Sequence, residues 1–203
     1  AIALEPETKS CDAIVQGWYN GQNGGIAIAD VLFGDCNPSG KLPITFHKND
    51  AQLPDYEDYA MSAGHTYRYM KEAPLFPFGH GLSYARFRYG RGRLDSRTMT
   101  PDGSVALTVP VRNGSRVDGD ETIQVYVAKV GDVEGPRYAL RAFRRVAVPA
   151  RQRVRATFTL TAKEICAFDN ESGTLACTPG TYRIYYGPSS DPASLRHIDV
   201  KVR

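Results

Sequence analysis

Apolar and polar residues alternate with a period of two along the carboxyl-terminal part of the chain, from about Leu94 onward. Such alternation is typical of β-strands with one buried and one exposed face. Turn-forming pairs such as Asn113-Gly114 and Pro179-Gly180 separate the runs. The pattern predicts an antiparallel β-sandwich of about seven strands over residues 90–203. The residues expected on its inner faces are Val105, Leu107, Val109 and Val111; Ile123, Val125 and Val127; Val154, Ala156, Phe158 and Leu160; Tyr182, Ile184 and Tyr186; and Ile198, Val200 and Val202.

The first 49 residues have helical spacing instead. Ser10 is a candidate cap for a helix over residues 13–19, and a second helical run covers residues 25–33 with Gly34 as its carboxyl cap. Residues 41–46 follow a turn and are expected to form a short strand. Two helices and one strand cannot close a layered core. We therefore expect the apolar residues of this region to need a sheet from elsewhere, among them Trp18, Ile28, Leu32 and Phe33.

Residues 50–89 are rich in Pro, Gly and Tyr and show no clear periodicity. This composition predicts a long ordered linker loop between the two regions. Loops of this length in compact proteins are usually functional or interfacial.

Charge changes sign along the chain. Residues 1–88 hold 7 basic and 10 acidic residues, a net charge of −3, whereas residues 89–203 hold 18 and 12, a net charge of +6. The shift indicates a boundary between two units. The arginines from Arg151 onward alternate with apolar residues, so they fit the solvent face of strands better than a nucleic-acid surface. We expect no nucleic-acid partner.

A membrane protein is not expected either, because the chain has no run of eighteen apolar residues. Its amino terminus also lacks the pattern of a signal peptide, so the chain is not expected to be an intact precursor.

Cys166 and Cys177 flank a segment with a turn-forming centre at residues 170–173. In a symmetric hairpin the two cysteines would lie opposite each other, so they are candidates for a disulfide; two buried thiols are the alternative. Cys11 and Cys36 lie at opposite ends of a helical stretch and would pair only if the chain doubled back. No cysteine has zinc-ligand spacing, and the histidines are scattered, so we expect neither a metal nor a cofactor.

Several motifs are similar to glycoside hydrolase family 3. Residues 13–46, AIVQGWYNGQNGGIAIADVLFGDCNPSGKLPITF, resemble the end of that family's α/β-sandwich domain. HTYRYM at 65–70 and PLFPFGHGLSYARF at 74–87 resemble the link into its fibronectin type III-like domain, and residues 119–130, 137–148 and 180–187 resemble strands of that domain. The resemblance implies an α/β fragment over residues 1–49, a linker over 50–89 and an all-β, immunoglobulin-like sandwich over 90–203.

The resemblance also implies where the chemistry lies. A retaining glycosidase uses two carboxyl groups about 5–5.5 Å apart. In this family the nucleophile is an Asp on a barrel domain, and the acid/base is usually a Glu upstream of the Trp motif. We therefore expect no catalytic residue in this chain. Its own acidic groups, including Asp30, Asp35 and the loop residues Asp55, Glu57 and Asp58, are expected to be solvated carboxylates.

Three residues of the linker are candidate substrate contacts. Tyr67 and Arg68 can donate hydrogen bonds to sugar hydroxyls, and His65 stands where relatives commonly have Arg. The alternative is that this loop packs on the neighbouring domain.

The resulting hypothesis is a segment of an exo-acting retaining β-glucosidase that removes terminal β-D-glucosyl residues from cello-oligosaccharides or other β-glucosides. A β-xylosidase of the same family and a free-standing, non-catalytic β-sandwich module are the alternatives. The expected partners are the barrel domain, the rest of the α/β domain and an oligosaccharide. Whether the enzyme also forms a homodimer is left open. The expected location is secreted or periplasmic.

Overall fold

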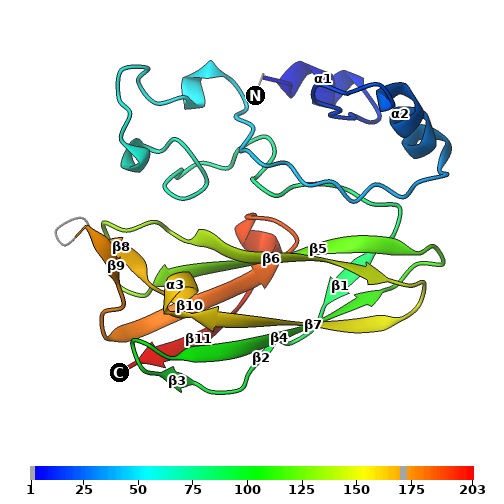
Figure 1. The fold of residues 1–203 in the computed structure, drawn as a ribbon. Coiled ribbons are helices and arrows are strands. Elements are labelled where there is room, and N and C mark those ends of the chain that lie inside the picture. The colour runs from blue at the N-terminus through cyan, green and yellow to red at the C-terminus, as the bar shows by residue number, and fades with distance from the viewer. Residues whose placement is uncertain (1–2, 170–172) are drawn as a thin grey trace.

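A computed structural model describes residues 3–169 and 173–203. Helices and long loops of the amino-terminal part lie along one side of a β-sandwich that the carboxyl-terminal part builds (Figure 1). The predicted fold class, an α/β fragment followed by an immunoglobulin-like β-sandwich, is confirmed. Among the described residues no helix is long and apolar enough to cross a membrane.

The sandwich consists of two sheets. In the four-stranded sheet the central strand is β4 (Ser104–Asn113), which pairs with β1 (Phe87–Tyr89), β2 (Arg93–Leu94) and β7 (Arg153–Thr161). The five-stranded sheet has the order β3 (Thr98–Met99), β11 (Arg196–Val202), β10 (Gly180–Gly187), β5 (Gly119–Lys129) and β6 (Ala139–Val148). The pairings are antiparallel except between β11 and β3.

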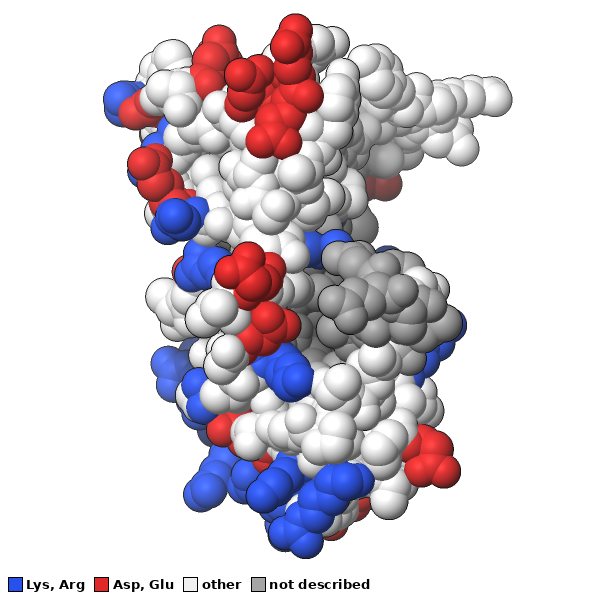
Figure 2. Space-filling model, turned by 90° about the vertical axis from the view of Figure 1, so that its left-hand side faces the viewer, with Lys and Arg blue, Asp and Glu red and all other residues white. Residues whose placement is uncertain are grey.

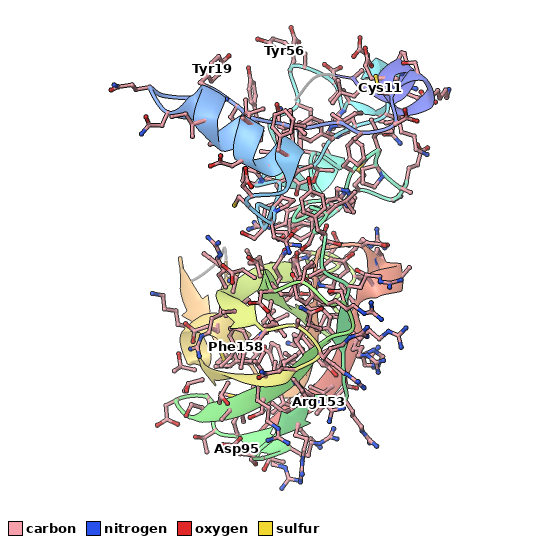
Figure 3. The ribbon with its side chains drawn as sticks, turned by 90° about the vertical axis from the view of Figure 1, so that its right-hand side faces the viewer. Cys11, Tyr19, Tyr56, Asp95, Arg153 and Phe158 are labelled. Carbon is pink, nitrogen blue, oxygen red and sulfur yellow. A yellow bond between two sulfur atoms is a disulfide. The ribbon has the colours of Figure 1, made fainter. Side chains whose placement is uncertain are left out.

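The core lies between these two sheets, where the alternating pattern placed it. Along β4 every second residue is buried, and Leu107, Val109 and Val111 are fully enclosed. Phe158 of β7 joins them from the neighbouring strand (Figure 3). Burial of such a side chain stabilises the fold by roughly 1.5–3 kcal/mol. All the residues predicted for the inner faces are buried or half-buried.

A small hairpin caps one end of the sandwich. The short helix α3 (Ala162–Ile165) begins with a capping box between Thr161 and Glu164. β8 (Ala167–Asp169) then pairs with β9 (Thr174–Ala176), which brings Cys166 and Cys177 to a Cα–Cα distance of 4.6 Å in a disulfide. Residues 170–172 of the predicted turn lie outside the described residues.

The amino-terminal helices differ in part from the prediction. α2 (Gly24–Phe33) forms as expected, and Gly34 adopts the left-handed conformation that ends it, with a φ of 87°. The helix predicted over residues 13–19 is wrong, because that segment is not helical and Ser10 instead ends α1 (Glu5–Ser10). Pro6 favours a helix start in α1, whereas neighbouring β-branched residues and Gly17 disfavour a helix over 13–19.

The strand predicted over residues 41–46 is also wrong. Leu42 and Phe46 exchange backbone hydrogen bonds with residues 75–80, but only one isolated bridge, between Phe46 and Phe76, results. Pro43 between them has no N–H to donate, so a continuous ladder cannot form there.

The linker covers part of the outer face of the five-stranded sheet, around Gln124 and Tyr126 of β5. It contains the short 3-10 helices η1 (Asp50–Gln52) and η2 (Met61–Ala63), and η3 (Pro192–Ser194) lies in the β10–β11 connection. Gln124 of β5 points outward yet is buried under the linker. Its Nε2 donates a hydrogen bond to the carbonyl of Gly79 at 3.1 Å. A Cβ on Gly79 would lie 2.0 Å from the Gln124 Oε1, and the φ of Gly79 is 79°, so glycine is required there.

The sandwich begins at β1, three residues before the predicted boundary at residue 90.

Candidate functional site

Tyr67 lies in the joint between linker and sandwich. Its ring stacks on Phe78 at a centroid distance of 4.8 Å and on Tyr138 at 5.9 Å, and its edge contact with Tyr126 is 5.7 Å. The Tyr67 hydroxyl oxygen accepts a hydrogen bond from the backbone N–H of Leu140 in β6 at 2.8 Å. The side chain therefore joins the linker to the five-stranded sheet.

The other two predicted contacts lie close by but do not converge on one pocket. The His65 Nε2 is 2.6 Å from the carbonyl oxygen of Asp58. This contact joins two segments of the linker to each other. Arg68 is exposed, and its carbonyl accepts from the backbone N–H of Arg137 at 2.8 Å. Of the three residues Arg68 is exposed, whereas His65 and Tyr67 are half-buried. A sugar contact at this segment stays a prediction.

A cleft that sequence reasoning missed lies beside Tyr67. Its volume is about 530 Å³, and residues 70–77 of the linker, Arg137, Tyr138 and residues 189–192 line it. His80 stacks on Phe76 at its wall, and burial, followed by the positive charge of Lys41, lowers the pKa of His80. The Ser190 Oγ is buried there without a hydrogen-bond partner among the described residues. No sequence motif indicated the cleft, because residues more than fifty positions apart form it.

The acidic side chains of the linker close its turns. Asp55 and Asp58 are exposed and accept hydrogen bonds from Glu57 and Ala60 backbone N–H groups, both at 2.9 Å, so they close turns of the linker. Across residues 3–169 and 173–203 no group of three His, Cys, Asp or Glu side chains is placed to hold a metal ion. Cys11 and Cys36 are free and exposed.

The amino-terminal part presents a large apolar surface to solvent. Trp18 is 47% exposed and Phe33 is 84% exposed, although both are large hydrophobic side chains. Figure 3 shows Tyr19 pointing away from the rest of the molecule. The remaining members of this surface are Ile14, Val15, Ile26 and Leu32. Exposed apolar patches of this kind mark interaction surfaces in soluble proteins.

Two family models match the chain. Residues 1–84 match the glycosyl hydrolase family 3 C-terminal domain, and residues 121–190 match the fibronectin type III-like domain. A xylan 1,4-β-xylosidase of Xylanibacter ruminicola is 49% identical over 98% of this chain. This chain belongs to glycosyl hydrolase family 3.

Some other relatives are named β-xylosidases and others β-glucosidases. A periplasmic β-glucosidase of Salmonella typhimurium is 37% identical over 93% of the chain. The structure of a β-glucosidase of Bifidobacterium adolescentis superposes with a TM-score of 0.85 at 30% identity, over 98% of this chain and 31% of that one. The chain spans 23% of the Xylanibacter relative and 26% of the Salmonella relative.

Proposed function

We propose that this chain is part of an exo-acting retaining β-glycosidase. Its first 49 residues complete an α/β-sandwich domain, and the remainder of that domain together with a barrel domain supplies the two catalytic carboxyl groups. The observation that carries the proposal is the exposed apolar surface around Trp18 and Phe33, in a chain that spans about a quarter of its relatives' length. Burial against a partner domain stabilises such a surface by about 25 cal/mol per Å².

The substrate we favour is a terminal β-D-xylosyl residue. The sequence motifs alone favour a glucosyl substrate, with a xylosyl substrate as the alternative. The 49% identity to a xylan 1,4-β-xylosidase, against 37% to the Salmonella β-glucosidase, supports the alternative. A secreted or periplasmic location is part of the proposal, because the Cys166–Cys177 disulfide persists in oxidising compartments.

Steady-state kinetics of the complete enzyme test this function. We expect kcat/KM to be higher for an aryl β-D-xyloside than for the matching β-D-glucoside. A higher value for the glucoside restores the glucosidase hypothesis, and no turnover of either refutes a β-glycosidase. The mass of the complete enzyme in solution tests whether a homodimer forms.

A further inference from the structure

Arginine side chains form a row across the outer face of the four-stranded sheet. Arg88 of β1 lies opposite Arg112 of β4, and Arg112 lies opposite Arg153 of β7. Residues directly opposite on antiparallel strands share one face, with their Cβ atoms about 4.5–5.5 Å apart. Three arginine side chains therefore leave the same face of the sheet from neighbouring positions on three strands, with Arg153 labelled in Figure 3.

Two further arginines extend the row into a patch. Arg155 lies opposite Pro110, two residues along β4 from Arg112, and Arg93 lies opposite Thr108, two residues further, so both extend the same face. We call this the arginine face, and its five members are Arg88, Arg93, Arg112, Arg153 and Arg155. All five are exposed, and none has an ion pair or a side-chain hydrogen bond to another described residue.

The strands of this sheet carry no acidic side chain. β1, β2, β4 and β7 contain no Asp or Glu, and Asp95, directly after β2, accepts from the backbone N–H groups of Ser96 and Ala106. On the five-stranded sheet, by contrast, Arg145 lies 2.6 Å from Asp120 and Arg183 lies 2.8 Å from Asp199. In the view of Figure 2 acidic side chains prevail at the upper end of the amino-terminal part and basic ones at the lower end of the sandwich, with both signs between them. Like charges directly opposite each other destabilise a sheet, so the arginine face favours a bound polyanion.

We propose that the arginine face binds a carboxylate-bearing polysaccharide, such as a chain of uronic acid residues. A guanidinium group matches a carboxylate in two parallel hydrogen bonds. The hydroxyls of Thr108 and Thr157 lie 3.2 Å apart on the same face and offer partners to sugar hydroxyls. Strand geometry separates Arg153 from Arg155 by about 7 Å, so an extended chain can meet several of these groups at once.

The shape of the face favours a glycan over a nucleic acid. The outward residues of β4 and β7 are Ser, Ala, Thr, Pro and Arg, so no aromatic side chain on these strands offers a stacking platform to a base. The glycan nature of the ligand rests on the proposed function, because an enzyme that trims glycans encounters acidic sugars on the same polymers. The preference for an anion rests on the structure alone.

Affinity measurements on the complete enzyme test the proposal, with polygalacturonate as the probe. Fully methyl-esterified polygalacturonate is the matched ligand, since it has the same backbone without free carboxylates. We expect tight binding to the first and little to the second, and binding that weakens as salt is added. Hydrolysis of a neutral aryl glycoside is measured separately, so failure of the proposed function is distinguishable from failure of this site.

Two charge-matched triple variants locate the site. Arg88→Gln/Arg112→Gln/Arg153→Gln should weaken binding roughly tenfold or more. Arg196→Gln/Lys201→Gln/Arg203→Gln removes the same charge from exposed positions at β11 and should leave binding unchanged. The single variant Arg112→Gln, at the centre of the row, should weaken binding several-fold on its own.

Three results would overturn the proposal. Equal binding to the esterified polymer excludes carboxylate recognition. Equal losses in the two triple variants show that net charge, not the arginine face, is responsible. Equally tight binding to single-stranded RNA shows a general polyanion surface in place of a glycan site.

Discussion

Lys41 and Glu121 form a buried ion pair between the amino-terminal part and the sandwich. The Lys41 Nζ lies 3.2 Å from the Glu121 Oε1, and the two side chains are 12% and 4% exposed. The Lys41 Nζ also donates to the carbonyl of Gly81 at 3.0 Å. Burial raises the pKa of Glu121, and the charge of Lys41 opposes that rise. The contact between the amino-terminal part and the sandwich therefore depends at this point on both Lys41 and Glu121.

Lys41→Met should lower the free energy of unfolding at neutral pH by about 3–5 kcal/mol, because the buried Glu121 carboxylate loses its counter-ion. The folded-state pKa of Glu121 is raised, so the cost of its charge is present above that pKa and vanishes as pH falls through it. The deficit of the variant should shrink in mildly acidic buffer. Urea unfolding of the whole chain at both pH values measures this.

The double variant Lys41→Met/Glu121→Gln is the matched control. It should recover most of the stability that Lys41→Met loses, since no unpaired charge stays buried. A double variant as unstable as Lys41→Met would show that the Lys41 contact with Gly81, not the ion pair, carries the effect.

The Cys166–Cys177 disulfide closes a short loop and should stabilise the sandwich. Its sequence separation is 11 residues. Cys166→Ser/Cys177→Ser should lower the free energy of unfolding by about 2–4 kcal/mol under oxidising conditions. Cys11→Ser/Cys36→Ser is the control and should cost little, because both cysteines are free and exposed. Recovery of Cys166 and Cys177 as free thiols from protein kept under oxidising conditions would refute the pairing.

Tyr67→Phe separates a structural role from a sugar contact. The variant leaves the Leu140 N–H without its acceptor, so we expect a loss of about 1–3 kcal/mol in stability with KM of the complete enzyme unchanged. A raised KM with unchanged stability would show that the hydroxyl serves the substrate. Arg68→Ala is the companion variant, since the exposed guanidinium of Arg68 should not affect stability, and its KM tests the predicted sugar contact.

The period-two pattern predicted the sandwich core well but not the outer face of β5. Alternation places Gln124 and Tyr126 toward solvent, yet both are buried under the linker. The near-continuous apolar run of residues 123–128 was the available signal, because strands covered on both faces lose their alternation. The linker itself has no periodic pattern, so the place where it packs could not be read from the sequence.

The amino-terminal errors have a common physical cause. The segments 13–19 and 41–46 have local patterns of helix and strand, but propensity is weak without packing to support it. The exposure of Trp18 and Leu32 shows that this packing is absent here. The family motifs nevertheless identified the two domain types, and the exposed apolar surface was predicted because two helices cannot cover each other.

The 203-residue chain alone should not hydrolyse aryl β-xylosides or aryl β-glucosides, because we place both catalytic carboxyl groups outside it. The assay compares the isolated chain with the complete enzyme on both substrates. Turnover by the isolated chain that disappears on changing an acidic residue within it, such as Asp30→Asn, would contradict this.

Hydrogen exchange on the isolated chain and on the complete enzyme tests the central claim most directly. We expect the amides of residues 13–33 to exchange quickly in the isolated chain and slowly in the complete enzyme, because the surface around Trp18 and Phe33 is covered only there. Residues 90–203 should be protected in both, since their two sheets close one core. Equal and strong protection of residues 13–33 in both proteins would contradict the account, because it would mean that this part is a self-sufficient domain.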